Sequence, residues 1–390
     1  MCRLVQRRGI IGLFCLLFVA SSVVPGWAQK DNRFEVSKNL DIFNSLLKEV
    51  EMFYVDSVDV DKTVQRGIEA MLAGLDPYTE YYPEQKTEEL SLMTTGEYGG
   101  IGSLIRQRNN EGGVMIAEPT EGMPADLAGL KQGDLILAID TIDVSKATNS
   151  RVSELLKGVP NTKMVLTIQR PGEKKPRKFE ITRKQITTPQ VTYYGVKNDS
   201  IGYIYLKAFT IKSAQEVKEA FLDLKKNHNI KSLVLDLRGN GGGVLEGAVQ
   251  IVGMFVPKGS EVLSTKGKIK QWDRTYRTST EPLDTVMPLA ILINGGTASA
   301  AEIVSGSLQD MDRAVLVGQR SFGKGLVQAP RDLPYNGKVK ITMSKYYIPS
   351  GRCIQQIDYS HRKEDGSVAA IPDSLTSVFY TSKKRPVRDG

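Results

Sequence analysis

The stretch SLVLDLRGNGGG, residues 232–243, joins an apolar run to a loop rich in glycine. The run predicts a buried strand that ends near Leu237. Upstream, GYIYLKAF (202–209) predicts a second strand, and SAQEVKEAFLDLKK (213–226) has the apolar spacing of an amphipathic helix. Two strands joined through a helix are typical of parallel pairing, so this stretch points to an α/β fold.

The same alternation continues downstream. It predicts a helix around Leu245–Phe255, a strand LAILIN (289–294), a helix from Ser299 to about Gln309 and a strand AVLVG (314–318). We therefore expect an α/β core over residues 190–360, with helices and a mixed, mainly parallel sheet. Sites in such sheets form at the carboxyl ends of the strands, where all three glycine-rich loops fall.

The two ends of the chain predict different things. Three arginines precede an apolar run from Gly9 to about Val24, and small residues follow up to Ala28. This layout predicts a secretory signal peptide over residues 1–28, and hence export to the periplasm or cell envelope. An uncleaved anchor that leaves the protein membrane-associated is the alternative, although the run is shorter than the ~20 residues that span a bilayer. Residues 361–390 form a C-terminal tail.

The remaining regions fit a chain of several domains. With 390 residues, of which 41% are hydrophobic and 25% charged, the composition is that of a globular protein. Residues 34–95 have a helical period that breaks at 74–78, and they suit packing or pairing. The net charge is +8. Its basic runs lack interleaved aromatic residues, so we expect a solvated face and no nucleic-acid partner.

Residues 96–186 resemble a PDZ domain. The resemblance rests on YGGIGSLI (98–105) and on VMIAEPTEGMPADLAGLKQGDLILAID (114–140). It implies that the turn Gly100, Ile101 and Gly102 points backbone N–H groups at a peptide's terminal carboxylate, while the next strand pairs with that peptide. Taken alone, the glycine cluster also fits an ordinary strand-entry turn.

Several kinds of chemistry are excluded by elimination. His228 lies in a polar connector and His361 in the tail, so a Ser-His-Asp triad and a histidine-rich metal site lack a well-placed imidazole. The stretch GQRSFGKG (318–325) imitates a phosphate-binding loop, but Gly325 stands where such a loop needs Ser or Thr. We expect no metal and no cofactor.

A serine and a lysine remain as the reactive pair. Ser299 begins a helix in GGTASAAEI (295–303), where Glu302 three residues later also fits a capping box. The N–H groups of the loop 236–243 can stabilise an oxyanion. With no usable histidine, lysine is the plausible base, and this role requires burial to lower its pKa from ~10.4. Lys324 has no carboxylate within seven residues in the sequence, which suits a neutral amine.

These segments together resemble the carboxyl-terminal processing peptidases, serine proteases with a Ser/Lys dyad and an embedded PDZ domain. The motifs are YGGIG, PADLAGLKQGD, DLRGNGGG, GTASAAEI, GQRSFGKGLVQ and YYIPSGRCIQ, between residues 98 and 355. The resemblance implies that Ser299 is the nucleophile, Lys324 the general base, and Gln328 its support. It assigns the oxyanion to backbone N–H groups of Gly242 and Ala300.

The resemblance also implies partners for the protein, and this sequence departs from the family's usual pattern at two places. It implies protein substrates with a free, apolar C-terminus, an acyl-enzyme, and a homodimer through the N-terminal helices. Gly241 stands where many members have proline, which loosens the loop. The chain stops at RPVRDG, whereas members usually continue. The alternative function is a catalytically idle protein that only holds C-terminal peptides.

Overall fold

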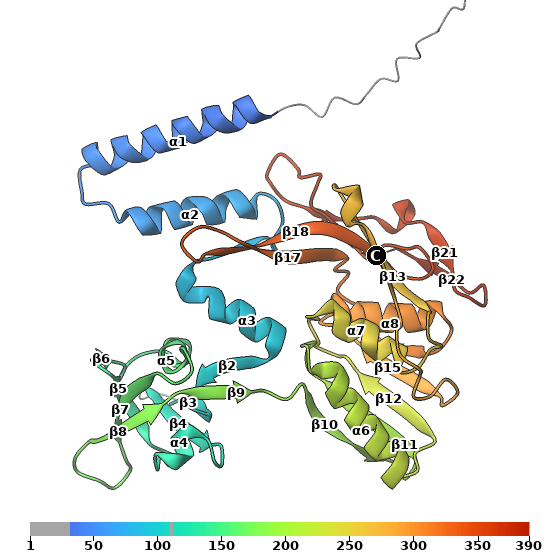
Figure 1. Cartoon of the computed structure of the whole chain (residues 1–390), viewed down its shortest axis with the longest axis horizontal. Helices are drawn as coiled ribbons and strands as arrows, with labels where there is room; N and C mark the ends of the chain where they lie inside the picture. The colour runs from blue at the N-terminus through green and yellow to red at the C-terminus, as the bar shows by residue number, and fades with distance from the viewer. Residues whose placement is uncertain (1–31, 109–111, 390) are drawn as a thin grey trace, which may run out of the picture. The chain divides into compact units, whose positions relative to one another are not determined.

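The computed structural model describes residues 32–108 and 112–389 (Figure 1). The predicted signal peptide lies outside these residues. The chain divides into two compact units after Arg66. The first holds helix α1 (Arg33–Phe53) and the start of α2 (Val60–Ala73). No residue of α1 is buried, and its exposed apolar side chains include Phe34, Leu40, Phe43 and Leu46.

A five-stranded sheet in the order β10-β11-β12-β15-β16 forms the centre of the second unit. The four strands from β11 to β16 are parallel, and β10 pairs antiparallel with β11. This confirms the α/β core with a mixed, mainly parallel sheet. The strand bounds are β10 Val191–Lys197, β11 Ile201–Leu206, β12 Ser232–Asp236, β15 Leu289–Ile293 and β16 Val315–Gly318.

Three helices connect the parallel strands. They are α6 (Ser213–Asn227), α7 (Leu245–Gly253) and α8 (Ala300–Asp310), as the sequence predicts within a few residues. The strand order advances in one direction, so right-handed crossovers place all three on the same face. Helix α7 indeed contacts both α6 and α8. Small side chains let α8 be buried along almost its whole length.

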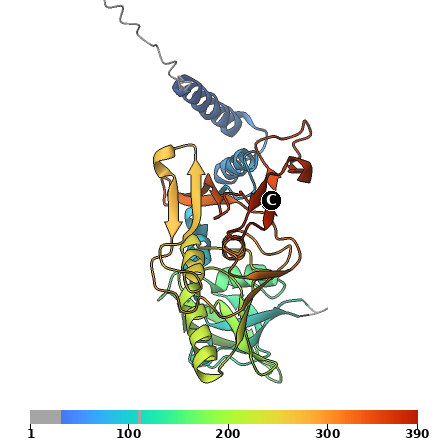
Figure 2. The ribbon, with the colours of Figure 1, turned by 90° about the vertical axis from the view of Figure 1, so that its right-hand side faces the viewer.

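A second, antiparallel sheet was not anticipated from the sequence. Its order is β1-β18-β13-β14, and β17 also pairs with β18. Figure 2 shows β13 and β14 as a yellow hairpin. The bounds are β1 Glu80–Tyr82, β13 Glu261–Gly267, β14 Arg274–Arg277, β17 Leu326–Asp332 and β18 Lys338–Tyr347. Strand β1 lies within the predicted helical region 34–95, so that region is not wholly helical: its residues Glu80–Tyr82 pair with β18.

The inserted domain has its own antiparallel sheet and its own apolar core. A ribbon of two strands, β2 (Glu97–Gly100) and β9 (Lys184–Thr187), leads into and out of it. Its elements are β3 Ser103–Gln107, β4 Val114–Pro119, α4 Pro124–Leu127, β5 Leu135–Ile139, β6 Ile142–Asp143, α5 Asn149–Leu156, β7 Lys163–Gln169 and β8 Arg177–Thr182.

Short elements complete the second unit. They are η1 Glu84–Lys86, α3 Thr87–Thr95, η2 Lys270–Trp272, β19 Ile357–Asp358, β20 Ala369–Ala370, η3 Asp373–Leu375, β21 Val378–Tyr380 and β22 Pro386–Arg388. The predicted tail 361–390 thus contributes a small hairpin of β21 and β22. None of the helices in the described ranges is long and apolar enough to cross a membrane.

Candidate active site

Ser299 occupies a strained turn at the carboxyl end of β15. Its φ of 56° and ψ of −116° lie outside the regions that non-glycine residues usually adopt. The turn is fixed from two sides, because Ala298 donates its N–H to the Asn240 carbonyl (2.9 Å) and Thr297 donates its hydroxyl to the Leu237 carbonyl (2.8 Å). Strain of this kind is typical of nucleophiles at strand-to-helix turns, which project the side chain from the sheet.

Lys324 lies on the loop between β16 and β17, partly buried. Burial is the largest cause that lowers the pKa of its amine, to about 8, and the positive charge of Lys340 adds to it. Asp76, Glu80 and Glu302 oppose the shift. Within the described residues the amine forms no ion pair. An amine with this pKa is partly neutral near pH 7, which a general base requires.

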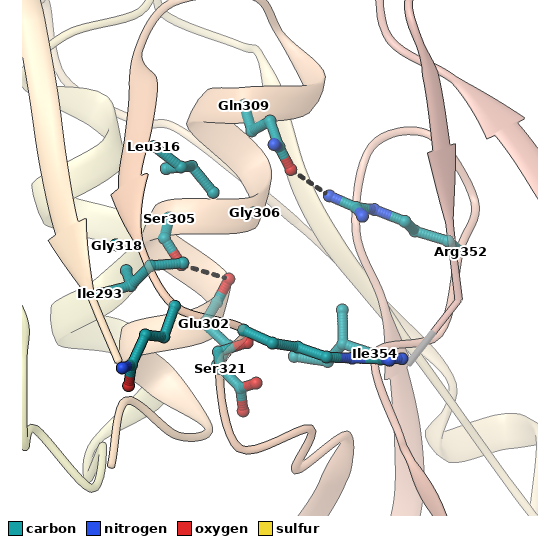
Figure 3. Close-up of a pocket in the computed structure, with 12 residues that line it drawn as sticks. Ile293, Glu302, Ser305, Gly306, Gln309, Leu316, Gly318, Ser321, Arg352 and Ile354 are labelled. Carbon is teal, nitrogen blue, oxygen red and sulfur yellow. Dashed lines mark hydrogen bonds between the residues drawn. The ribbon is translucent and has the colours of Figure 1, made fainter. Parts of the chain in front are cut away.

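One buried carboxylate holds the serine and lysine segments together. Glu302 is 3% exposed and accepts the N–H groups of Ser299 (2.7 Å), Lys324 (2.9 Å) and Gly323 (2.7 Å). Burial raises the pKa of Glu302, while these bonds and one from Ser321 lower it. Figure 3 shows Glu302 and Ser321 beside each other in a cavity of about 320 Å³. Glu302, the capping-box partner of Ser299, thus accepts hydrogen bonds from both the serine segment and the lysine segment.

A buried hydroxyl makes a second link between the same two segments. Tyr346, 1% exposed, donates to the Lys324 carbonyl and lies 3.1 Å from the Ser299 carbonyl, within hydrogen-bond distance. Burial raises the pKa of Tyr346 well above its usual value, so the hydroxyl stays protonated and keeps donating. The structure therefore brings together the segments of the two residues predicted as nucleophile and base.

The glycine-rich loop lies directly against the nucleophile. A Cβ on Gly242 would be 2.8 Å from Ser299 Cβ, so only glycine fits there. However, Gly242 donates its own N–H to Asn240 Oδ1 at 2.9 Å, and this arrangement does not leave it free for a substrate oxygen as the sequence suggested. In the described part of the chain, the N–H groups of Ala300 and Gly243 donate to no other residue, and they remain available to an oxyanion.

Gln328 lies on β17, four residues after Lys324. Its side-chain amide donates to Thr342 Oγ1 at 3.0 Å. No hydrogen bond joins Gln328 to Lys324 among the residues that the structure describes. Its support of Lys324 therefore stays a prediction.

The predicted carboxylate-binding turn lies between β2 and β3. Ile101 and Gly102 turn their carbonyl groups inward, where these accept the N–H groups of Ala125 (2.8 Å) and Thr120 (2.9 Å). Their own N–H groups have no partner within the described ranges. Among the residues that the structure describes, strand β3 pairs with β4 alone, so its other edge is open to an added strand. Gly100 ends β2, where a Cβ would meet the Tyr98 ring at 2.6 Å.

Comparison with known proteins decides the family. A profile of peptidase family S41 matches residues 200–360, and a PDZ-domain profile matches residues 115–170. A carboxy-terminal-processing protease of Bartonella bacilliformis is 36% identical over 356 residues, which cover 90% of this chain and 81% of that protein. The chain belongs to this protease family. It is a carboxy-terminal-processing serine peptidase with an S41 core and an inserted PDZ domain.

Two further proteins illustrate the similarity. A probable CtpA-like serine protease of Staphylococcus aureus strain COL is 32% identical over 320 residues, covering 81% of this chain and 62% of its own length. A solved photosystem II D1 C-terminal processing protease matches with 29% identity and a TM-score of 0.45, over 82% of this chain and 88% of that one.

The structure adds residues that sequence reasoning missed. Tyr346 lies in the motif YYIPSGRCIQ, which gives it no role by itself, and the sequence around Glu302 indicates only a capping box. Tyr78 lies in the break of the helical period, and the structure places its ring against the Lys324 amine. Both histidines are exposed, as expected. No cluster of metal-ligating side chains occurs among the described residues.

Proposed function

We propose that this peptidase is an exported endopeptidase that cleaves through a dyad of Ser299 and Lys324. In this proposal its PDZ domain captures the free, apolar C-terminus of a protein and delivers the chain to the core. The signal-like sequence of residues 1–28 supports export to the periplasm or cell envelope.

The shared attachment of the two segments carries the proposal. Glu302 binds the backbone N–H groups of both Ser299 and Lys324, and Tyr346 lies against the carbonyl groups of both. The backbone of the residue with a lowered pKa is thereby tied to the same two side chains as the backbone of the strained serine. A buried amine near a hydroxyl at a strained turn is the arrangement that a Ser/Lys dyad needs.

The reaction then follows from these groups. The neutral Lys324 amine takes the hydroxyl proton of Ser299 as the oxygen attacks the scissile carbonyl carbon. Backbone N–H groups at Ala300 and in the glycine-rich loop stabilise the negative oxygen. The lysine ammonium gives its proton to the leaving amine, and an ester to Ser299 forms. Water, deprotonated by Lys324, hydrolyses that ester and restores both residues.

The geometry of the PDZ domain supports capture of a C-terminus. The N–H groups of Ile101 and Gly102 can meet a terminal carboxylate, and the open edge of β3 can pair with the residues before it. Substrates then extend from this domain toward the core. Dimerisation through the N-terminal helices stays a prediction, supported by the exposed apolar residues of α1.

Cleavage of an unfolded protein with an apolar C-terminus tests the dyad. We expect Ser299→Ala and Lys324→Ala to lose activity by about 10²–10⁴-fold, with products read by mass spectrometry. Equal cleavage by the unchanged chain and both variants contradicts the dyad.

The same substrate with an amidated C-terminus tests capture by the PDZ domain, because amidation removes the carboxylate. We expect slower cleavage of the amidated form, and equal rates contradict capture.

A further inference from the structure

The segment Asp76–Tyr82 reaches the catalytic lysine by sheet pairing. Its strand β1 pairs antiparallel with β18, with Glu80 opposite Lys340. Strand β18 also pairs with β17, which begins at Leu326, two residues after Lys324. A segment that precedes the PDZ domain in the chain therefore belongs to the second sheet, which also contains the strand that follows Lys324.

Tyr78 makes the contact. The Lys324 amine lies over the Tyr78 ring, 4.3 Å from its centroid, within the range of cation–π contacts. In the part of the chain that the structure describes, no carboxylate lies within ion-pair distance of this amine. The contact joins a residue of the N-terminal segment to the base across about 250 positions of sequence.

The ring is held from two directions. On its own segment, the Asp76 carboxylate accepts the N–H groups of Tyr78 and Thr79, both at 2.8 Å, and this fixes the backbone turn. Beyond the ring, Tyr359 packs edge-on with centroids 5.9 Å apart, and the two hydroxyl oxygens are 3.4 Å apart. Asp76 is 6% exposed, so the turn is shielded from water. The Tyr78 ring is therefore held by its own backbone turn and by the ring of Tyr359.

We propose that Tyr78 is a positioning residue for the protease reaction, because its ring holds the Lys324 amine in place and excludes water from it. The inference rests on the proposed function, in which Lys324 is the base. It makes the segment 76–82 part of the active site, although the segment lies outside the S41 match at residues 200–360.

The ring has two opposite effects on the amine. The attraction between ring and ammonium favours the charged form, whereas the exclusion of water favours the neutral form. Burial is the largest cause that lowers the pKa of Lys324, so we expect the exclusion of water to be the stronger of the two effects of the ring. The charged groups that face the amine are Lys340 on β18, Glu302 on α8, and Asp76 and Glu80 on the segment itself. None of these is changed by a substitution at Tyr78.

The proton affinity of Lys324 tests the inference directly. In a Ser299→Ala background, the rate at which acetic anhydride acetylates Lys324 is followed against pH by mass spectrometry. With Tyr78 present we expect half-maximal reactivity near pH 8. In Tyr78→Ala, water reaches the amine, and we expect the midpoint to rise by about one unit. In the chain with Ser299, cleavage at pH 7 then falls about tenfold.

Two variants serve as controls. Tyr78→Phe keeps the ring, so we expect the midpoint to stay unchanged. Tyr81→Ala removes a neighbouring aromatic ring from the same segment, 76–82, and leaves the midpoint unchanged if the effect belongs to Tyr78. Should Tyr78→Ala not fold, Tyr78→Leu, which is smaller than the ring, replaces it with the same expected direction.

The outcomes separate this inference from the proposed function. An unchanged or lowered midpoint in Tyr78→Ala, or an equal rise in Tyr81→Ala, overturns the role of Tyr78. Full cleavage by Lys324→Ala instead overturns the dyad. The pH midpoint of Lys324 acetylation does not depend on cleavage, so it still measures the effect of the Tyr78 ring on the amine. A rise confined to the variants that lack the Tyr78 ring supports the inference.

Discussion

At the level of single residues, Lys324 shows what a local sequence can and cannot indicate. The sequence around it contains no carboxylate within seven positions, and this suggested a neutral amine. In the fold, Asp76, Glu80 and Glu302 face it from other elements. Its pKa is nevertheless lowered, because burial outweighs them. A lowered pKa of Lys324 could be predicted from the sequence, but the ring of Tyr78 and these charges are brought in by tertiary contacts.

Ser299 and Glu302 give a similar lesson. Their spacing predicted a helix cap, and Glu302 does accept the Ser299 N–H. The same carboxylate also accepts N–H groups of Gly323 and Lys324, which are more than 20 positions away. A helix cap is a local sequence pattern. The hydrogen bonds from Gly323 and Lys324 to Glu302 depend instead on where the fold places the loop after β16. Glu302 therefore both caps α8 and binds the loop that carries Lys324.

Glu302→Gln tests whether that attachment sets the dyad. The neutral amide has one acceptor oxygen for three N–H groups, so we expect the free energy of unfolding to fall by about 2–3 kcal/mol. We also expect kcat to fall at least tenfold with little change in KM, because the link through Glu302 no longer fixes the two segments relative to each other. Chemical denaturation and steady-state kinetics measure the two effects.

Glu216→Gln is the matched control, since this carboxylate accepts the N–H groups of Gln190 and Val191 in the same core. We expect it to lower stability but to preserve kcat. If Glu302→Gln behaves in the same way as Glu216→Gln, Glu302 is only a cap.

At the level of elements, the central sheet could be predicted and the second sheet could not. Strands β12 and β15 are short apolar runs between helices, and their period is visible in sequence. Strand β18 is half-buried over most of its length and alternates weakly, while β1 has three residues. The pairing of β1 with β18 places Glu80 opposite Lys340. The local sequence pattern of either strand cannot indicate a contact between residues so far apart in the chain.

Gly243→Ala tests the glycine-rich loop as an element. Gly243 has a φ of 138°, and a Cβ would lie 2.0 Å from the Phe209 carbonyl oxygen, which is backbone and cannot yield. The loop must therefore leave its present position, in which the adjacent Gly242 lies against Ser299. We expect activity to fall by about 10²-fold, the size of effect seen when an oxyanion donor is lost. Circular dichroism checks that the fold persists.

The control for this loop is Gly295→Ala. Gly295 lies in the neighbouring loop after β15, and a Cβ there would meet nothing within 4 Å. We expect activity and stability close to those of the unchanged chain. Equal activity of Gly243→Ala and Gly295→Ala contradicts the requirement for glycine at residue 243.

At the level of the whole molecule, the second unit contains two separate apolar cores, one in the protease sheet and one in the PDZ domain. The order of these parts along the chain could be predicted, because each carries its own motifs. The contacts between them could not. Glu97, at the start of the PDZ ribbon, pairs with Lys212 at the start of α6. Phe209, three residues before Lys212, contacts the glycine-rich loop, because it donates its N–H to the Gly242 carbonyl (2.9 Å).

The pH dependence of Ser299 labelling tests the central claim most directly. A fluorophosphonate probe reacts with an activated serine, and the modified residue is identified by mass spectrometry. We predict that labelling of the full chain rises with pH and is half-maximal near pH 8, because the neutral Lys324 amine is the reactive form. In Lys324→Ala we predict a loss of about 10²-fold or more. Labelling of Ser299 at the same rate and with the same pH dependence in Lys324→Ala would contradict the account.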